Sequence, residues 1–328
     1  MISLALVGLG EVGQHHCRAI ATAPATRFAW ACDLDDGLLG ASGAERTTHD
    51  LDEVLADPSV DAISVCLPHH LHAPVAVRAL AAGKHVLLEK PMAMSVAEAD
   101  QVIAAARTAG RSVGVSHNQA LYLPHARARR LIDDGAVGRV LQIRARLAIG
   151  GKYGAWRADP AQAGGGLLFD AGVHRVYVMR LLGGEVSAVT AIVDRAGRED
   201  GFIVVLEFAS GATGVIDGTY HCPEGVFDDR VEIAGSAALV EIAGLEAYFE
   251  GFADPTTPQL RIYRDGAWSA DDVRDTWDAS VRRSVQGFIA AVAAGRPPPV
   301  TAQDGRAAVA IIEAAYASAR EGRTVKLD

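Results

Sequence analysis

A glycine-rich turn directly after the first apolar run constrains the fold most strongly. Gly8-Leu9-Gly10-Glu11-Val12-Gly13 follows the apolar run Leu4–Val7 and opens a predicted helix, with the spacing G-x-G-x-x-G. In such a turn the first glycine permits a tight bend, the second lets a pyrophosphate approach the backbone, and the third allows close helix–strand packing. The amino terminus of the helix then faces the negative charge of the pyrophosphate. The turn therefore predicts a dinucleotide site on a strand–helix unit.

An acidic residue strengthens that prediction and bears on which dinucleotide is bound. Asp33 lies twenty residues after Gly13, at the end of a second predicted strand, where a carboxylate can accept hydrogen bonds from an adenosine ribose. The same carboxylate would repel a 2′-phosphate, and the next residues, 34–36, supply no cation to bind one. The sequence thus predicts NAD and disfavours NADP. The alternative is a structural glycine turn with an unrelated surface aspartate.

Short apolar runs and helical stretches alternate along the first third of the chain. The helix predicted at Val96–Ala109 begins after Ser95, with Glu98 completing a capping box. Repeated strand–helix units of this kind predict a doubly wound parallel α/β domain over residues 1–120. The predicted buried strands are Leu4–Val7, Phe28–Cys32, Ala62–Cys66, Val86–Leu88 and Val113–Val115.

After residue 120 the pattern changes to strand-like runs without long helical crossovers. This predicts an α+β domain over residues 121–328, with a large, mainly antiparallel sheet covered by helices on one face. The predicted helices are Pro124–Asp134, Asp272–Ala294 and Thr301–Arg320, and the predicted strands are Val140–Ile149, Val186–Val193, Phe202–Phe208, Ala212–Tyr220, Val231–Ile233 and Leu239–Ile242.

Composition narrows the classes of partner and location. The 40 acidic residues outnumber the 31 Lys and Arg, for a formal charge of −9, which works against binding to nucleic acid backbones. No stretch approaches the roughly 20 apolar residues that span a bilayer, and the apolar start lacks a basic leader. The four cysteines show no metal-ligand spacing, so no metal site is predicted. These features predict a soluble, cytoplasmic protein with neither nucleic acid nor a membrane as partner.

A lysine follows the predicted strand at Val86–Leu88. Lys90 lies just past the carboxyl end of that strand, which is the edge where doubly wound sheets bind ligands. Beside a nicotinamide, a lysine can exchange a proton with a substrate hydroxyl. The alternative is an exposed lysine paired with Glu89.

A third group of polar residues combines Trp156 and Arg157 with an acid and a histidine. If a helix begins near Gly165, Asp170 and His174 are spaced i, i+4 and share one face, where they can bind and deprotonate a hydroxyl. The preceding glycines would let the backbone approach a ligand. The alternative is an ordinary hydrogen bond on a helix surface.

Together these motifs resemble the Gfo/Idh/MocA family of NAD(P)-dependent oxidoreductases. The resemblance rests on the glycine turn, on the A-G-K-H-V-L-x-E-K-P run at Ala82–Pro91, and on the W-R…G-G-G…D-x-G-x-H run at Trp156–His174. It implies an N-terminal Rossmann domain and a C-terminal domain whose open sheet often builds homodimers or homotetramers. The implied reaction is hydride transfer between NAD and a secondary alcohol or ketone of a sugar, cyclitol or polyol.

The resemblance also implies roles for individual residues. Lys90, Asp170 and His174 would form the catalytic set. Pro68, His72, Glu89 and Lys90 would join Gly8, Gly10, Glu11, Val12, Gly13 and Asp33 around the cofactor, and Asn118, Trp156 and Arg157 would join the catalytic set around the substrate.

Two departures from the family pattern lie on the substrate side. The arginine that often follows Asn118 by two residues is absent, and Tyr177 stands where many members carry an acid. The identity of the substrate therefore does not transfer.

Two alternative functions stay open, a biosynthetic keto-sugar reductase and a non-catalytic dinucleotide-sensing protein. His15 and His16, in the first helix, are interpreted as packing or solvated residues.

Overall fold

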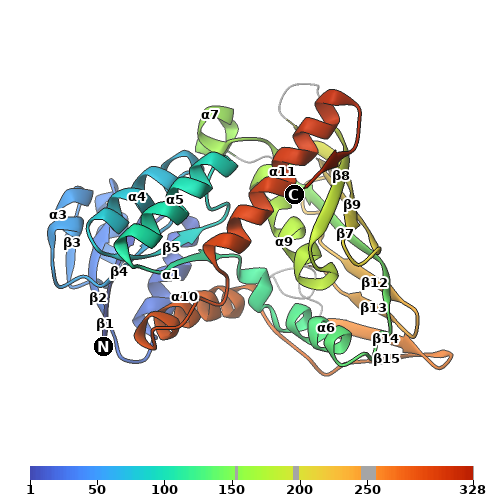
Figure 1. Ribbon diagram of the computed structural model, residues 1–328. Coiled ribbons are helices and arrows are strands. Elements are labelled where there is room, and N and C mark those ends of the chain that lie inside the picture. Colours follow the sequence, from blue (N-terminus) through green and yellow to red (C-terminus); the bar gives the residue numbers. More distant parts are fainter. Residues whose placement is uncertain (152–153, 195–198, 245–255, 328) are drawn as a thin grey trace. The chain divides into compact units, whose positions relative to one another are not determined.

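The computed structural model describes residues 1–151, 154–194, 199–244 and 256–327 (Figure 1). Its compact units interleave in sequence: the first contains residues 1–118 and 278–309, and the second contains residues 119–277 and 310–328. The chain thus returns to the first unit after the second has been largely built. The predicted boundary between a cofactor domain and a substrate domain after residue 120 stays a prediction.

The first unit contains a parallel sheet of six strands in the order β3-β2-β1-β4-β5-β6. The order reverses between β1 and β4, which is the switch point of a doubly wound sheet, so the predicted class is confirmed. The short, mostly exposed β3 carries no apolar run and was not predicted. The strands are β1 (Ile2–Val7), β2 (Thr26–Cys32), β3 (Arg46–Thr48), β4 (Ala62–Val65), β5 (His85–Glu89) and β6 (Val113–Ser116), and the helices are α1 (Glu11–Ala21), α2 (Asp36–Ala41), α3 (Leu51–Ala56), α4 (His72–Ala81), α5 (Val96–Ala109) and α10 (Trp277–Ala293).

Helix α10 completes the hydrophobic core of this sheet. Val285, Phe288 and Ile289 are buried in one cluster with Leu4 and other strand residues. A Cβ at Gly114 would lie 2.8 Å from the ring of Phe288, so β6 admits the helix only because this position is glycine. The apolar face of α10 is therefore explained by the first unit, although the sequence places the helix after the strands of the second.

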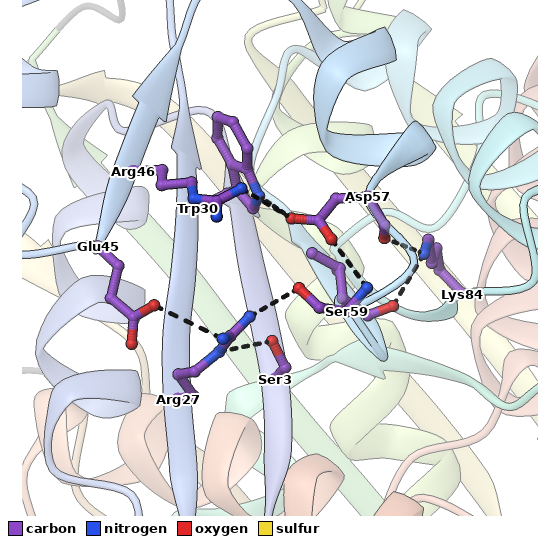
Figure 2. A network of polar contacts seen from close by, with 9 residues as sticks. Ser3, Arg27, Trp30, Glu45, Arg46, Asp57, Ser59 and Lys84 are labelled. Atoms are coloured by element: carbon purple, nitrogen blue, oxygen red, sulfur yellow. Dashed lines mark hydrogen bonds and ion pairs between the residues drawn. The ribbon is translucent and has the colours of Figure 1, made fainter.

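A polar network ties together the amino ends of the strands (Figure 2). Asp57 accepts a hydrogen bond from Trp30 Nε1 at 2.8 Å, and Lys84 Nζ donates to the carbonyl of Asp57 at 2.7 Å. Arg27 donates to the hydroxyls of Ser3 and Ser59 at 3.2 and 2.8 Å. Ser3 and Lys84 stand at the amino ends of β1 and β5, opposite the sheet edge that carries the glycine turn. This network stabilises the fold and takes no part in the predicted site.

The Asp57 carboxyl gives a testable dependence of stability on pH. Hydrogen bonds from Trp30 and Ser59 lower its pKa to about 2. Because the folded pKa is depressed, this stabilisation is present above the unfolded value near 4 and is lost as pH falls toward 2. We expect Asp57→Asn to lower the unfolding free energy by about 1–2 kcal/mol at pH 7. The difference in unfolding free energy between the native chain and Asp57→Asn should shrink as the pH is lowered from 7 toward 2. Urea denaturation at a series of pH values measures it.

The exposed neighbour Glu53 supplies the control for this experiment. Glu53→Gln should leave the unfolding free energy within about 0.5 kcal/mol of the native value at every pH. An Asp57→Asn deficit that stayed constant down to pH 2.5 would contradict an ionised hydrogen-bond acceptor at this position.

The described part of the second unit builds a ten-stranded sheet in the order β15-β14-β13-β12-β7-β10-β9-β8-β16, with β11 paired to β7. Strands β7 and β10 are parallel and the other pairs antiparallel, as the predicted mainly antiparallel sheet requires. The strands are β7 (Val140–Gly150), β8 (Val186–Val193), β9 (Gly201–Phe208), β10 (Thr213–Cys222), β11 (Phe227–Asp228), β12 (Val231–Gly235), β13 (Leu239–Ile242), β14 (Leu260–Arg264), β15 (Ala267–Ala270) and β16 (Val325–Lys326).

Helices cover one face of this sheet. Helix α9 packs against β7 and β10, and inward-facing residues such as Ile143 and Ile233 are fully buried. None of the described helices is both long and apolar enough to cross a lipid bilayer. The helices are α6 (Leu123–Asp133), α7 (Pro160–Ala163), α8 (Leu167–Asp170), α9 (Gly172–Gly183) and α11 (Ala302–Glu321), the last of which begins among residues of the first unit.

Candidate active site

The glycine turn has the geometry that a dinucleotide requires. Gly8 has φ +87°, and a Cβ there would overlap the carbonyl of Cys66. A Cβ at Gly13 would overlap the carbonyl oxygen of Gly8. By contrast, no atom lies within 4 Å of the Cβ position of Gly10. Glycine is therefore needed at positions 8 and 13 because neighbouring backbone packs directly against them. Gly10 instead faces open space, into which a pyrophosphate fits.

Asp33 is held against this turn at the carboxyl end of β2. Its Oδ2 accepts from the amide of Leu9 at 2.5 Å, and its Oδ1 accepts from the amide of Asp35 at 3.0 Å. The carboxylate thus lies beside the glycine turn, where the ribose of NAD would meet it. Glu11 and Val12 lie in the first turn of α1, exposed and partly exposed. The residues present fit NAD.

A buried acid binds the backbone of Lys90 and is itself bound by a buried histidine. Glu89, the last residue of β5, accepts from the backbone amide of Lys90 at 3.1 Å and contacts His16 Nε2 at 3.1 Å. The other ring nitrogen of His16, Nδ1, lies 2.8 Å from the hydroxyl of Ser64 on β4. Burial raises the pKa of Glu89, but hydrogen bonds from His16 and Ser116 and the charges of His16 and Lys90 outweigh it, so the pKa is lowered. Glu89 is therefore an ionised anchor for the start of the Lys90 turn.

His72 connects this turn to the loop after β4. Its Nδ1 lies 2.7 Å from the carbonyl oxygen of Pro91, and its Nε2 lies 2.8 Å from that of Leu67. Burial lowers the pKa of His72 and favours the neutral ring. Pro68 precedes the short 3-10 helix His69–Leu71 that leads into α4. The hydrogen bonds observed for His72 are with backbone, its ring also packs edge-on against that of His69, and its predicted contact with the cofactor stays a prediction.

In the second unit, the structure brings together an arginine and an acid of the predicted site. Arg157 Nε lies 3.3 Å from Asp170 Oδ2, and the acid is buried. The guanidinium carbon of Arg157 lies 4.7 Å from the ring centroid of Trp156. The pair offers guanidinium N–H donors and carboxyl oxygen acceptors side by side, which suits the binding of a polyhydroxylated ligand.

The helix predicted from Gly165 is divided into two segments. Asp170 ends α8, Ala171 lies between, and His174 is the third residue of α9, partly exposed. The Asp170 amide still bonds to the carbonyl of Gly166, so the helical path is nearly continuous. The i, i+4 spacing thus spans a junction between two segments.

The predicted site residues fall into both units. Lys90 and Asn118 belong to the first, and Asp170 and His174 belong to the second. The Asn118 amide, predicted to contact substrate, donates to Ser280 at 2.8 Å and is buried. The described residues contain no group of three or more His, Cys, Asp or Glu side chains that could hold a metal ion.

Sequence reasoning missed the contribution of His16. It was interpreted as a packing or solvated residue, and its full burial agrees with packing, but its hydrogen bonds to Ser64 and Glu89 were not predicted. Its position three residues after Gly13, on the face of α1 turned to the sheet, was the available signal.

Comparison with known proteins decides the family. Residues 2–117 match the model of an oxidoreductase family with an NAD-binding Rossmann fold, and residues 125–241 match the GFO/IDH/MocA C-terminal domain. The chain belongs to the Gfo/Idh/MocA family of oxidoreductases. The family, the fold class and the NAD-binding domain that were predicted from the sequence are thereby confirmed.

Similar proteins match over almost their full length. Myo-inositol 2-dehydrogenase of Thermotoga maritima is 28% identical, over 99% of this chain and 98% of the relative. The structure of GenD2 from gentamicin A biosynthesis, in complex with NAD, is 32% identical with a TM-score of 0.85 and covers 100% of this chain and 96% of its own. An aldose-aldose oxidoreductase from Caulobacter crescentus, complexed with glycerol, is 29% identical with a TM-score of 0.86, over 99% of both chains.

Proposed function

We propose that this NAD-binding oxidoreductase oxidises a secondary alcohol of a sugar, cyclitol or polyol, or reduces the corresponding ketone. The observation that carries the proposal is the placement of Lys90 at the carboxyl edge of the same sheet as the glycine turn, with its backbone anchored by Glu89. The names of the similar proteins, an inositol dehydrogenase and an aldose oxidoreductase, support the substrate class.

Each residue of the catalytic set has a distinct role in this proposal. When bound, oxidised NAD supplies the hydride acceptor and reduced NAD the donor. Lys90 takes the proton of the substrate hydroxyl as the carbon loses hydride, and His174 assists in that transfer. Asp170, held beside Arg157, orients the substrate through its hydroxyls. Asn118 and Trp156 contact the substrate, and Pro68, His72, Glu11 and Val12 contact the dinucleotide.

The first experiment is a substrate panel of inositols, hexoses, pentoses and their ketones. Formation or consumption of NADH is followed by absorbance in both directions, with NAD and NADP compared. Turnover with any cyclic polyol or sugar supports the proposal. Tight NADH binding without turnover on the whole panel would contradict the substrate class, and absence of NADH binding would contradict the assignment of the glycine turn.

Asp33 should determine the preference for NAD. We expect Asp33→Asn to lower the ratio of the NADPH dissociation constant to the NADH dissociation constant by about 10-fold or more. The reason is that the change removes repulsion of the 2′-phosphate of NADPH. The asparagine oxygen can still accept from the Leu9 amide, which belongs to the glycine turn, while the bond from the Asp35 amide is lost. Binding is measured by NADH and NADPH fluorescence. Asp36→Asn, whose native side chain is 92% exposed on the following helix, is the control and should leave the ratio unchanged.

We also propose an arrangement in which residues 1–120 bind NAD and residues 121–328 bind substrate and build a homodimer or homotetramer. Exposed apolar side chains on the sheet of the second unit support the assembly: Ile192 is 71% exposed and Ile203 47%. A cytoplasmic location is proposed from the four cysteines, all of which are free. Sedimentation of the native chain and of Ile192→Lys tests the assembly.

A further inference from the structure

A buried glutamate outside the predicted site binds the segment that carries Asp170. Glu199 lies just before β9 and is 8% exposed. Its Oε1 accepts from the amide of Leu168 at 2.7 Å, and its Oε2 accepts from the amide of Gly166 at 3.1 Å. Its own carbonyl accepts from the amide of Leu167 at 3.0 Å. One residue therefore binds three consecutive amides at the start of α8, which the helix itself leaves without partners.

A tyrosine from α11 and the glycine run complete this arrangement. The hydroxyl of Tyr316 donates to Glu199 Oε2 at 2.6 Å. A Cβ at Gly166 would overlap the carbonyl of Glu199, and a Cβ at Gly165 would lie 2.5 Å from the Tyr316 hydroxyl. Gly165 and Gly166 thus make room for the protein's own glutamate and tyrosine, and their predicted approach to a bound ligand stays a prediction.

We propose that Glu199 is a positioning residue: its carboxylate fixes the first turn of α8, and thereby Asp170 and the following His174, in the orientation needed for turnover. This rests on the proposed function of that pair. The path is short, because Asp170 is the fourth residue of α8 and its amide bonds to the carbonyl of Gly166. Loss of the negative charge should loosen the segment, since a protonated carboxyl has fewer lone pairs for N–H donors.

The charge of Glu199 changes near neutral pH. Burial raises its pKa to about 7, although the bonds from Tyr316 and from the two amides oppose this rise, and the charge of Asp200 adds to it. His221 on β10, next to this region, pairs with Asp194 at 3.4 Å. Gly166 and Leu168 bind the Glu199 carboxylate through backbone amides, and the titratable side chain of this turn, Asp170, lies 3.3 Å from Arg157. The carboxylate form, and with it the ordered segment, is therefore expected to predominate above pH 7.

Because the pKa of Glu199 is raised, the unfolding free energy should fall with rising pH while turnover should rise. A folded pKa raised above the unfolded value near 4.5 means that stability is lost as pH rises from about 4.5 through 7. Removing the charge by Glu199→Gln should relieve that loss and make unfolding less dependent on pH. The same variant should have lower turnover, because the glutamine NH2 cannot accept from the Gly166 amide. A residue that served stability alone would not separate the two effects.

The test compares the native chain with Glu199→Gln and Tyr316→Phe. We expect kcat of the native chain to rise through an apparent pKa near 7, and Glu199→Gln to lose that ionisation and about 10–100-fold in kcat at pH 8. Tyr316→Phe removes a bond that lowers the pKa of Glu199, so its profile should move to higher pH. Glu207→Gln, exposed on β9, is the matched control and should keep the native profile. NADH affinity should be unchanged in all of them.

A second measurement separates this inference from the proposed function. Hydrogen exchange of residues 164–170 at pH 8 reports on the anchor without any substrate, and Glu199→Gln should exchange these amides at least about 10-fold faster than the native chain. Faster exchange with native kcat and native pH profile would overturn the role in turnover. Native exchange rates in Glu199→Gln would overturn the anchor itself. If the native chain turns over no substrate, the exchange result alone decides the anchor, and the proposed function fails separately.

Discussion

Replacing Lys90 with methionine should lower kcat by about 10²–10⁴-fold and leave NADH affinity within a few-fold. Methionine keeps the length and most of the apolar volume of lysine but has no group that exchanges protons. The Lys90 amide still donates to Glu89, since that bond uses the backbone. The loss should therefore appear in the chemical step and leave binding and folding intact. Steady-state kinetics with the best substrate of the panel, together with NADH fluorescence titration, measure both quantities.

Lys326→Met is the control for this variant, because Lys326 is exposed on β16. Its kcat should match that of the native chain. Survival of turnover within a few-fold in Lys90→Met would show that another group takes the hydroxyl proton, with His174 as the next residue to replace.

The second large effect is expected from two glycines of the same turn, replaced one at a time. At Gly13 a Cβ would overlap the carbonyl oxygen of Gly8, so Gly13→Ala must separate α1 from β1. We expect Gly13→Ala to lower the unfolding free energy by about 1–3 kcal/mol. The variant should also lose NADH binding. At Gly10 a Cβ meets nothing within 4 Å, and φ is −58°, which alanine adopts readily. Gly10→Ala should keep native stability within about 0.5 kcal/mol.

The pair separates cofactor binding from folding. Gly10→Ala should still weaken NADH binding by about 10–100-fold, because its methyl group occupies the space where the pyrophosphate approaches the backbone. Urea denaturation and NADH titration of both variants check these expectations. Native NADH affinity in Gly10→Ala would show that the pyrophosphate does not lie over this residue.

Local patterns were sufficient for the first sheet and for the cofactor turn. Strands that are buried on both faces appear in the sequence as short apolar runs. Five of the six observed strands coincide closely with the predicted runs. The turn needs glycine at defined offsets, so its spacing is visible in the sequence. β3 has only three residues and little apolar character, and β14 and β15 are mostly exposed, so none of them gave a signal.

The partner of α10 could not be read from its sequence. Periodicity identified a helix over Asp272–Ala294, and the structure begins it at Trp277. An amphipathic pattern shows that one face is buried but not against which sheet. Contacts with Leu4 and Leu87 place this helix with strands nearly two hundred residues or more earlier in the chain.

What the sequence determined by itself is the chemistry that depends on local spacing: the glycine turn, the acid twenty residues beyond it, and the two long family motifs around Lys90 and His174. Tertiary structure alone decided which groups support them. His16 reaches Glu89 across 73 residues of sequence and Glu199 reaches Gly166 across 33. Such partners meet only because strands and helices bring distant backbone together, and a buried donor or acceptor must be satisfied by whatever group the packing places beside it.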